Sequence, residues 1–217
     1  MKIGLLVCDY VKAEYQAVYG TYPEMFQALF PDYELEIYRV HQGDFPENVT
    51  DCNIYMATGS SHSVYENLEW IHQTKVFIQE LYKANRYFIG FCFGHQLMAS
   101  ALGGKVAKAT DVGWCVGVHE FRINRIKKWM RPAKTVVNFL MMCQDQVIEL
   151  PKNAVCLGGN EDCPNAIIQI GERMMSIQAH PEFSADYQSE GKSQTGIIGP
   201  ALNKQQRTAL LAYIKTL

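Results

Sequence analysis

Short apolar runs alternate with longer amphipathic segments along the first half of the chain. Each apolar run reads as a strand, and each amphipathic segment has the periodicity of a helix. In chain order the segments are Lys2–Cys8 (strand), Tyr22–Phe30 (helix), Glu34–Val40 (strand), Asn53–Thr58 (strand), Trp70–Ala84 (helix), Tyr87–Phe91 (strand) and Gly94–Leu102 (helix). Because parallel strands need a crossover connection, this alternation predicts an α/β fold with a parallel sheet covered by helices on both faces.

The second half of the chain contains strand candidates that follow one another closely. They are Val116–Asn124, Val136–Cys143, Ala154–Leu157, Ala166–Ile170 and Met174–Gln178. The short turns between them favour hairpins, so we expect an antiparallel extension of the sheet. A closing helix is expected at Thr208–Thr216, after the loop Ser184–Pro200, which is rich in Ser, Gly and Gln. No segment has the composition of a linker, which favours a single domain over residues 1–217.

The composition fits a globular protein with a sizeable core, since 48% of the 217 residues are hydrophobic. A formal net charge of -2 gives little electrostatic case for nucleic acid as a partner. The most basic stretch, Arg122–Arg131, is expected to cap a short helix or to form its solvent-exposed face. The apolar run before Asp9 is too short for a membrane span and lacks a signal-peptide cleavage pattern. Seven cysteines without a CxxC pair predict reduced thiols in a cytoplasmic protein, and they give little support to structural zinc.

Cys92 lies between the Tyr87–Phe91 strand and the helix that follows, with Gly90 and Gly94 two positions away on either side. A nucleophile on a sharp strand-to-helix turn needs small neighbours, because bulky ones would clash with adjoining backbone. The start of the helix directs N–H groups and the positive end of its dipole at the thiol, which favours the thiolate. By itself, however, the Gly-x-Cys-x-Gly pattern fits an unreactive buried cysteine equally well.

A cysteine nucleophile needs a base, and the base needs an orienting group. Of the six histidines, His180 has the most suitable surroundings, at the end of the apolar run MMSIQAH. Pro181 stiffens the chain after it, and the carboxylate of Glu182 can fold back towards one imidazole nitrogen. The other histidines are interpreted as surface, packing or orienting residues: His41, His62, His72, His95 and His119.

An oxyanion hole needs backbone N–H groups aimed at the developing negative charge. One donor is predicted to be the N–H of Phe93, and the other to come from the glycine-containing loop MATGSSHSVY (Met56–Tyr65). Gly59 in this loop is free to adopt a positive φ. In isolation the loop reads as an ordinary strand-to-helix turn, and the combination with Cys92 and His180 favours the oxyanion hole.

These motifs together resemble the class I glutamine amidotransferase family. GFCFGHQ (Gly90–Gln96) is similar to its nucleophile motif, HPEF (His180–Phe183) to its histidine–glutamate motif, and ATGSSHSVYE (Ala57–Glu66) to the oxyanion loop of stand-alone, γ-glutamyl hydrolase-like members. Further similarity lies in ALGG (101–104), GW (113–114) and QDQV (144–147). The resemblance therefore runs from the first strand to about Phe183.

The resemblance implies a three-layer flavodoxin-like domain that needs no metal and no organic cofactor. It implies hydrolysis of the γ-amide of glutamine or of another γ-glutamyl compound through a thioester, with release of ammonia or an amine. The residues carried over are Cys92 as nucleophile, His180 as base, Glu182 as its orienting carboxylate, Gly59 and Phe93 as oxyanion donors, and Gln96 as a substrate-binding residue.

The sequence departs from the family pattern at two places. Gly59-Ser60-Ser61 stands where many relatives have Gly-Gly-Pro, and Cys143 stands where many have histidine. The second departure leaves the role of Asp145 open between a substrate contact and a turn residue. The loops Tyr10–Tyr22, Gly113–Gly117 and Ser184–Gly199 are expected to set specificity for the γ-glutamyl substrate.

Two alternative functions stay open at this point. The first is a glutaminase subunit that delivers ammonia to a synthetase; the sequence shows no acceptor domain, so this function would require a partner protein. The second is a non-catalytic or redox-sensing protein on the same fold. The free thiols support it, and the intact Cys, His and Glu set is evidence against it. For the hydrolase and for the glutaminase subunit alike, a small-molecule substrate is expected, without a membrane or nucleic-acid partner.

Overall fold

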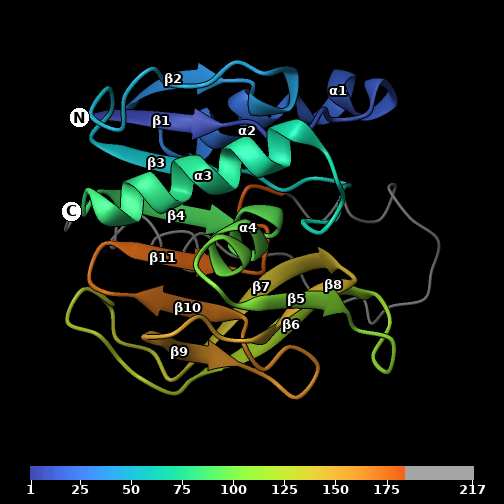
Figure 1. Ribbon diagram of the computed structural model, residues 1–217. Helices are drawn as coiled ribbons and strands as arrows, with labels where there is room; N and C mark the ends of the chain where they lie inside the picture. The colour runs from blue at the N-terminus through green and yellow to red at the C-terminus, as the bar shows by residue number, and fades with distance from the viewer. Residues whose placement is uncertain (184–217) are drawn as a thin grey trace.

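The computed structural model describes residues 1–183, and its centre is a nine-stranded sheet (Figure 1). The strand order is β2-β1-β3-β4-β11-β10-β9-β6-β7, and β5 and β8 form a separate two-stranded sheet. The strands are β1 Lys2–Leu6, β2 Glu34–Tyr38, β3 Ile54–Ala57, β4 Tyr87–Phe91, β5 Lys105–Lys108, β6 Cys115–Ile123, β7 Val136–Cys143, β8 Asp145–Glu149, β9 Ala154–Gly159, β10 Ile167–Ile170 and β11 Met174–Ile177. The helices are α1 Ala13–Tyr19, α2 Tyr22–Leu29, α3 Glu69–Lys83 and α4 Phe93–Ala101, with the 3-10 helix η1 Val40–Gln42.

The first half of the sheet is parallel and covered on both faces. β2, β1, β3, β4 and β11 pair in parallel, and successive side chains of each strand enter opposite layers of the core. Ile54 and Met56 of β3 belong to the layer that contains α2, whereas Tyr55 belongs to the layer that contains α3 and α4. The latter two helices lie over one face of the sheet in Figure 1. The predicted α/β, flavodoxin-like fold is therefore confirmed.

The second half of the sheet is antiparallel, as the closely spaced strand candidates predict. β11, β10, β9, β6 and β7 pair in antiparallel fashion, and the longest pairing joins β6 to β7 from Cys115↔Cys143 to Arg122↔Val136. The helix expected at Arg122–Arg131 is wrong. Arg122 and Ile123 end β6, and the segment after them makes only a single turn, closed by the N–H of Met130 on the carbonyl of Lys127 at 3.0 Å.

The short elements that the sequence does not predict include α1, β5 and β8. α1 has seven residues, and β5 and β8 pair only with each other, so none of them carries a long apolar signature. The predicted loop Ser184–Pro200 and helix Thr208–Thr216 lie outside the described residues. Within residues 1–183, no helix is both long and apolar enough to cross a membrane.

Candidate active site

Cys92 occupies the joint between β4 and α4 in a strained backbone conformation. Its φ of 48° and ψ of -101° lie in a region that residues with a side chain rarely adopt. Two main-chain hydrogen bonds hold it there: its N–H donates to Ile177 of β11 at 2.9 Å, and its carbonyl accepts from Gln96 of α4 at 3.1 Å. The sulfur is thereby presented at the carboxyl end of the parallel strands, where sites of α/β proteins form.

The two flanking glycines are required by close backbone approach, as the sequence analysis predicts. A Cβ on Gly90 would lie 2.3 Å from the carbonyl oxygen of Gly94, and a Cβ on Gly94 would lie 2.4 Å from that of Ala57. No side chain fits at either distance, because the neighbouring atoms are backbone. The strand β4, the following turn and β3 are therefore packed without room for a methyl group.

Replacing Gly94 with alanine is expected to lower the free energy of unfolding by about 3 kcal/mol, because the turn has to move away from Ala57. Denaturant unfolding measures the change. Gly103→Ala is the matched control: its φ of 91° strains a side chain, but nothing lies within 4 Å of the added Cβ, so a loss of about 1 kcal/mol is expected. Equal losses in the two variants would contradict the close contact at Gly94.

His180 and Glu182 form a buried pair beside Cys92. The His180 Nδ1 lies 2.9 Å from Oε1 of Glu182, and the two side chains are 4% and 0% exposed. Since Nδ1 faces a carboxylate, we assign a proton to Nδ1, which leaves Nε2 as the ring nitrogen available to Cys92. Phe183 stacks on the imidazole at 4.2 Å between ring centroids and an interplanar angle of 4°.

The pKa of His180 is raised to about 10. Burial alone lowers it, but the negative charges of Cys92 and Glu182 and the hydrogen bonds to both outweigh burial. Among the described residues, the second carboxylate oxygen of Glu182, Oε2, is buried without a hydrogen-bond partner. The favourable contacts of this carboxylate are therefore concentrated on the imidazole, which suits a thiolate–imidazolium–carboxylate arrangement.

The loop after β3 passes directly against the imidazole ring. Gly59 does not use the positive φ that is open to glycine, since it is not among the residues with φ above zero. Glycine is required there for another reason: a Cβ would lie 2.8 Å from Cε1 of His180. The sequence does not reveal this contact, because it joins segments far apart in the chain. The N–H groups of Gly59 and Phe93 stay predicted oxyanion donors.

Asp9, just beyond the end of β1, holds this loop in place. Its Oδ2 accepts hydrogen bonds from the Ser61 N–H at 2.7 Å, the Ser61 hydroxyl at 2.7 Å and the Ser60 hydroxyl at 3.3 Å. Asp9 is not among the site residues predicted from the sequence. The signal for it is a carboxylate placed directly after a buried parallel strand.

Gln96 and Asp145 connect the loop to the far wall of the site. The Gln96 amide donates to the main-chain carbonyl of Asp145 at 2.8 Å. The Asp145 carboxylate accepts from the Ser63 hydroxyl at 2.5 Å and from the Tyr65 hydroxyl at 3.2 Å. Asp145 begins β8 and ties the loop to that strand, so it is not a simple turn residue.

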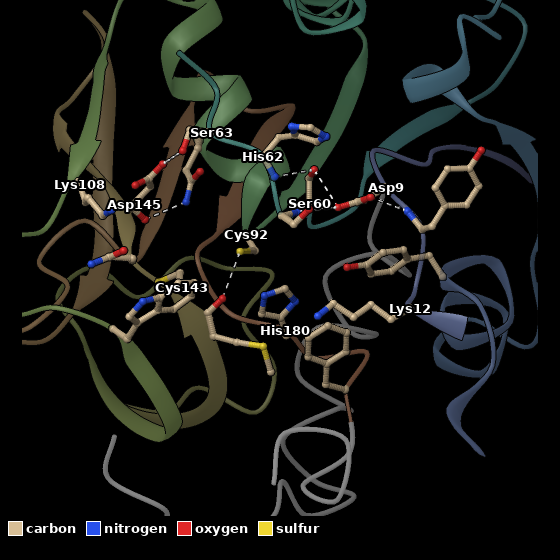
Figure 2. Close-up of a pocket in the computed structure, with 18 of the residues that line it drawn as sticks. Asp9, Lys12, Ser60, His62, Ser63, Cys92, Lys108, Cys143, Asp145 and His180 are labelled. Carbon is tan, nitrogen blue, oxygen red and sulfur yellow. Dashed lines mark hydrogen bonds between the residues drawn. The ribbon is translucent and has the colours of Figure 1, made fainter. Parts of the chain in front are cut away.

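These elements enclose a pocket of about 510 Å³ (Figure 2). Cys92 and His180 lie together at its centre, with Lys12 on one side and Lys108 beside Asp145 on the other. The loops Tyr10–Tyr22 and Gly113–Gly117, predicted to set specificity, supply part of the wall, whereas Ser184–Gly199 lies outside the described residues. The lining residues that the sequence analysis does not select include Asp9, Ser63, Lys108, Met142 and His62, the last of which pairs with Glu66 at 2.8 Å.

Cys143 also lines the pocket, and its thiol is buried. It lies directly opposite Cys115 in the pairing of β6 with β7. A hydrogen bond with the Cys115 thiol, together with burial, raises the pKa of Cys143 well above its ordinary value. Cys143 is therefore expected to stay a neutral thiol near Cys92. Within residues 1–183, no group of three or more His, Cys, Asp or Glu side chains is arranged to hold a metal ion.

The fold agrees with comparisons to known proteins. Residues 32–195 match the model of the family described as glutamine amidotransferase class-I. The chain therefore belongs to the class-I glutamine amidotransferase family.

Two relatives of the chain are named gamma-glutamyl peptidases, and a solved structure shares its fold. The chain is 32% identical to gamma-glutamyl peptidase 4 of Arabidopsis thaliana, over 77% of this chain and 70% of that protein. It is 30% identical to gamma-glutamyl peptidase 3 of the same plant, over 84% and 76%. In structure it is similar to a glutamine amidotransferase from Methylobacillus flagellatus, with a TM-score of 0.73, 16% identity and coverage of 100% and 94%; this likeness shows the fold.

Proposed function

We propose that the protein hydrolyses the γ-amide bond of γ-glutamyl compounds through a γ-glutamyl thioester on Cys92. The observation that carries the proposal is the strained turn that places Cys92 beside the buried His180–Glu182 pair at the centre of the pocket. Relatives named gamma-glutamyl peptidase support the choice of bond.

In the first half of the reaction, the Cys92 thiolate attacks the γ-carbonyl carbon. The negative charge passes to the carbonyl oxygen, which accepts from the N–H groups of Gly59 and Phe93. His180, held by Glu182, gives its Nε2 proton to the departing nitrogen as the C–N bond breaks. Ammonia or an amine leaves, and the glutamyl group stays on sulfur as a thioester.

In the second half, neutral His180 takes a proton from water, and the resulting hydroxide attacks the thioester carbon. The C–S bond breaks, glutamate leaves, and the thiolate–imidazolium pair is restored. Glu182 keeps its negative charge in both halves and stabilises the imidazolium each time that it forms. The site uses only groups of this chain and water.

The pocket favours a substrate larger than glutamine. Its volume of about 510 Å³ lies in the range that takes drug-sized ligands. Lys12 and Lys108 stand on its two sides, and a γ-glutamyl peptide carries two carboxylates that lysine ammonium groups attract. Gln96 and Asp145 line this pocket and are joined by a hydrogen bond, which supports a contact of the Gln96 side chain with the glutamyl part.

We expect the purified protein alone to cleave γ-glutamyl peptides with kcat/KM at least about tenfold higher than for glutamine, because the larger substrates fill more of the pocket. A panel of glutamine, γ-glutamyl peptides and γ-glutamyl amines, with glutamate release as the readout, measures this. The matched control is a peptide joined through the α-carboxyl of glutamate, which is expected to stay intact. Activity on glutamine that appears only with an added synthetase would instead support ammonia delivery to a partner protein.

A further inference from the structure

The side chain of Gln178 contacts the Cys92 sulfur and has no part in the reaction described above. Gln178 follows β11 directly and is fully buried. Its amide nitrogen Nε2 lies 3.5 Å from Sγ of Cys92, and its oxygen Oε1 accepts from the Gln96 amide at 3.2 Å. Its main-chain N–H donates to the carbonyl of Ala166 at 2.8 Å, which fixes the base of the side chain.

The neighbours of Gln178 determine which end of its amide faces the sulfur. The main-chain carbonyl of Asp145 only accepts hydrogen bonds, so the Gln96 nitrogen has to face it. The second hydrogen on that nitrogen then points to Gln178 and requires an oxygen there. The remaining end of the Gln178 amide, its N–H donor, is thereby directed at Cys92.

A donor in this position interacts differently with the two forms of the nucleophile. A thiolate accepts a charge-assisted hydrogen bond, which is about twice as strong as a bond to a neutral acceptor. The site is buried, so water does not compete for the sulfur on this side. The main chain of Cys92 is held on the same strand, since its N–H donates to Ile177, the residue before Gln178.

We infer that Gln178 holds the Cys92 thiolate by donating its side-chain N–H to the sulfur, as a second donor besides His180. The inference deepens the proposed function and rests on Cys92 acting as the nucleophile. It also gives Gln96 a second role, because the Gln96 amide sets the direction of the Gln178 amide. The path from Asp145 through Gln96 and Gln178 links the loop that Ser63 belongs to with the reacting atom.

The test is Gln178→Met, which keeps the length of the side chain and removes the donor. The rate at which iodoacetamide alkylates Cys92 is followed against pH by mass spectrometry of the Cys92 peptide. We expect the pH of half-maximal rate to rise by about one unit, with kcat/KM near pH 7 lower by roughly tenfold. Other thiols do not obscure the measurement, because the readout is alkylation of the Cys92 peptide itself. This matters for Cys115, whose pKa is lowered by a hydrogen bond with Cys143.

Gln169→Met is the matched control. Gln169 is a buried glutamine of β10 outside this network, and its Oε1 has no hydrogen-bond partner among the described residues. Its replacement should leave the alkylation profile at the wild-type position. A profile of Gln178→Met that superimposes on wild type overturns the inference, whereas a shift in Gln178→Met alone supports it.

A further measurement covers the case in which the variant does not fold. If Gln178→Met does not fold, the side-chain amide protons of Gln178 are followed by NMR in the wild-type protein, where they should titrate with the same midpoint as Cys92 alkylation; no change across that midpoint overturns the inference. Alkylation needs no turnover, so the inference and the proposed function fail separately. A shifted profile in a protein inactive on every γ-glutamyl compound would overturn the proposed function only.

Discussion

Cys92→Ser is expected to lower kcat on γ-glutamyl peptides by on the order of 10⁴-fold or more, while the protein stays folded. The reason is chemical: a serine hydroxyl in the same position loses its proton far less readily than a thiol, and the Gln178 amide nitrogen lies 3.5 Å from the sulfur, a distance that suits sulfur and is long for a smaller oxygen. Steady-state release of glutamate measures the loss. Circular dichroism and thermal unfolding confirm that the variant is folded.

The control for this substitution is Cys156→Ser. Cys156 is a half-buried thiol of β9 that donates to the carbonyls of Gly158 and Pro164, and it does not line the pocket. Its replacement should leave kcat unchanged within about twofold. A glutamine-mimicking electrophile should label Cys92 in the wild type and in Cys156→Ser. Turnover by Cys92→Ser at the wild-type rate, or labelling at another cysteine, would show that the nucleophile is misassigned.

The parts of the site that the sequence predicts are those whose residues lie within a few positions of one another in the chain. Cys92 is recognisable because its two glycines lie within two positions, and the structure shows that each is needed for backbone packing. Glu182 is recognisable as a partner of His180 because it lies two residues away, at 2.9 Å in the fold. The same is true of the core: β4 and β7 are predicted with the bounds that the structure shows, since β4 is a run of apolar residues and β7 is apolar except for Asn138.

The parts that the sequence does not predict depend on contacts between distant segments. Gln178 meets Cys92 across 86 positions, and Ser63 meets Asp145 across 82. Gly59 shows the limit most clearly: its position in the site is anticipated, but the reason for glycine is the approach of His180 and not a positive φ. Periodicity describes which face of a strand is buried and carries no information about which loops meet at its end.

Glu182→Gln tests the electrostatics of the site, because it keeps the shape of the side chain and removes its charge. The negative charge of Glu182 contributes to raising the pKa of His180 to about 10, so the variant should have a lower His180 pKa. If the new amide turns its N–H towards Nδ1 of His180, it also favours the tautomer of His180 that has its proton on Nε2 and not on Nδ1. We expect kcat to fall roughly 10²–10⁴-fold. The matched control is Glu149→Gln, which removes an exposed carboxylate that pairs with Lys105 at 3.4 Å and should leave the rate unchanged.

The pH dependence of kcat/KM separates the loss of this charge from a general loss of activity, because only the former moves the pH profile in a definite direction. In the proposed mechanism the imidazolium stabilises the thiolate and supplies the proton for the leaving group, so kcat/KM of the wild type should fall as pH rises through about 10. In Glu182→Gln this fall should begin at lower pH, and in Glu149→Gln it should stay where it is in the wild type. An alkaline limb at the same pH in all three proteins would contradict the role given to Glu182.

The free energy of unfolding should also depend on the titration of His180. The pKa of His180 is higher in the folded protein than its ordinary value of 6.5, so proton binding favours the folded state. This contribution is fully present below about pH 6.5 and is lost as pH rises through about 10. Glu182→Gln should therefore lose less stability than the wild type between pH 7 and pH 10 by denaturant unfolding. An equal loss in both proteins would mean that the buried pair is not the group that titrates, and the acid that serves the leaving group would have to be sought elsewhere in the pocket.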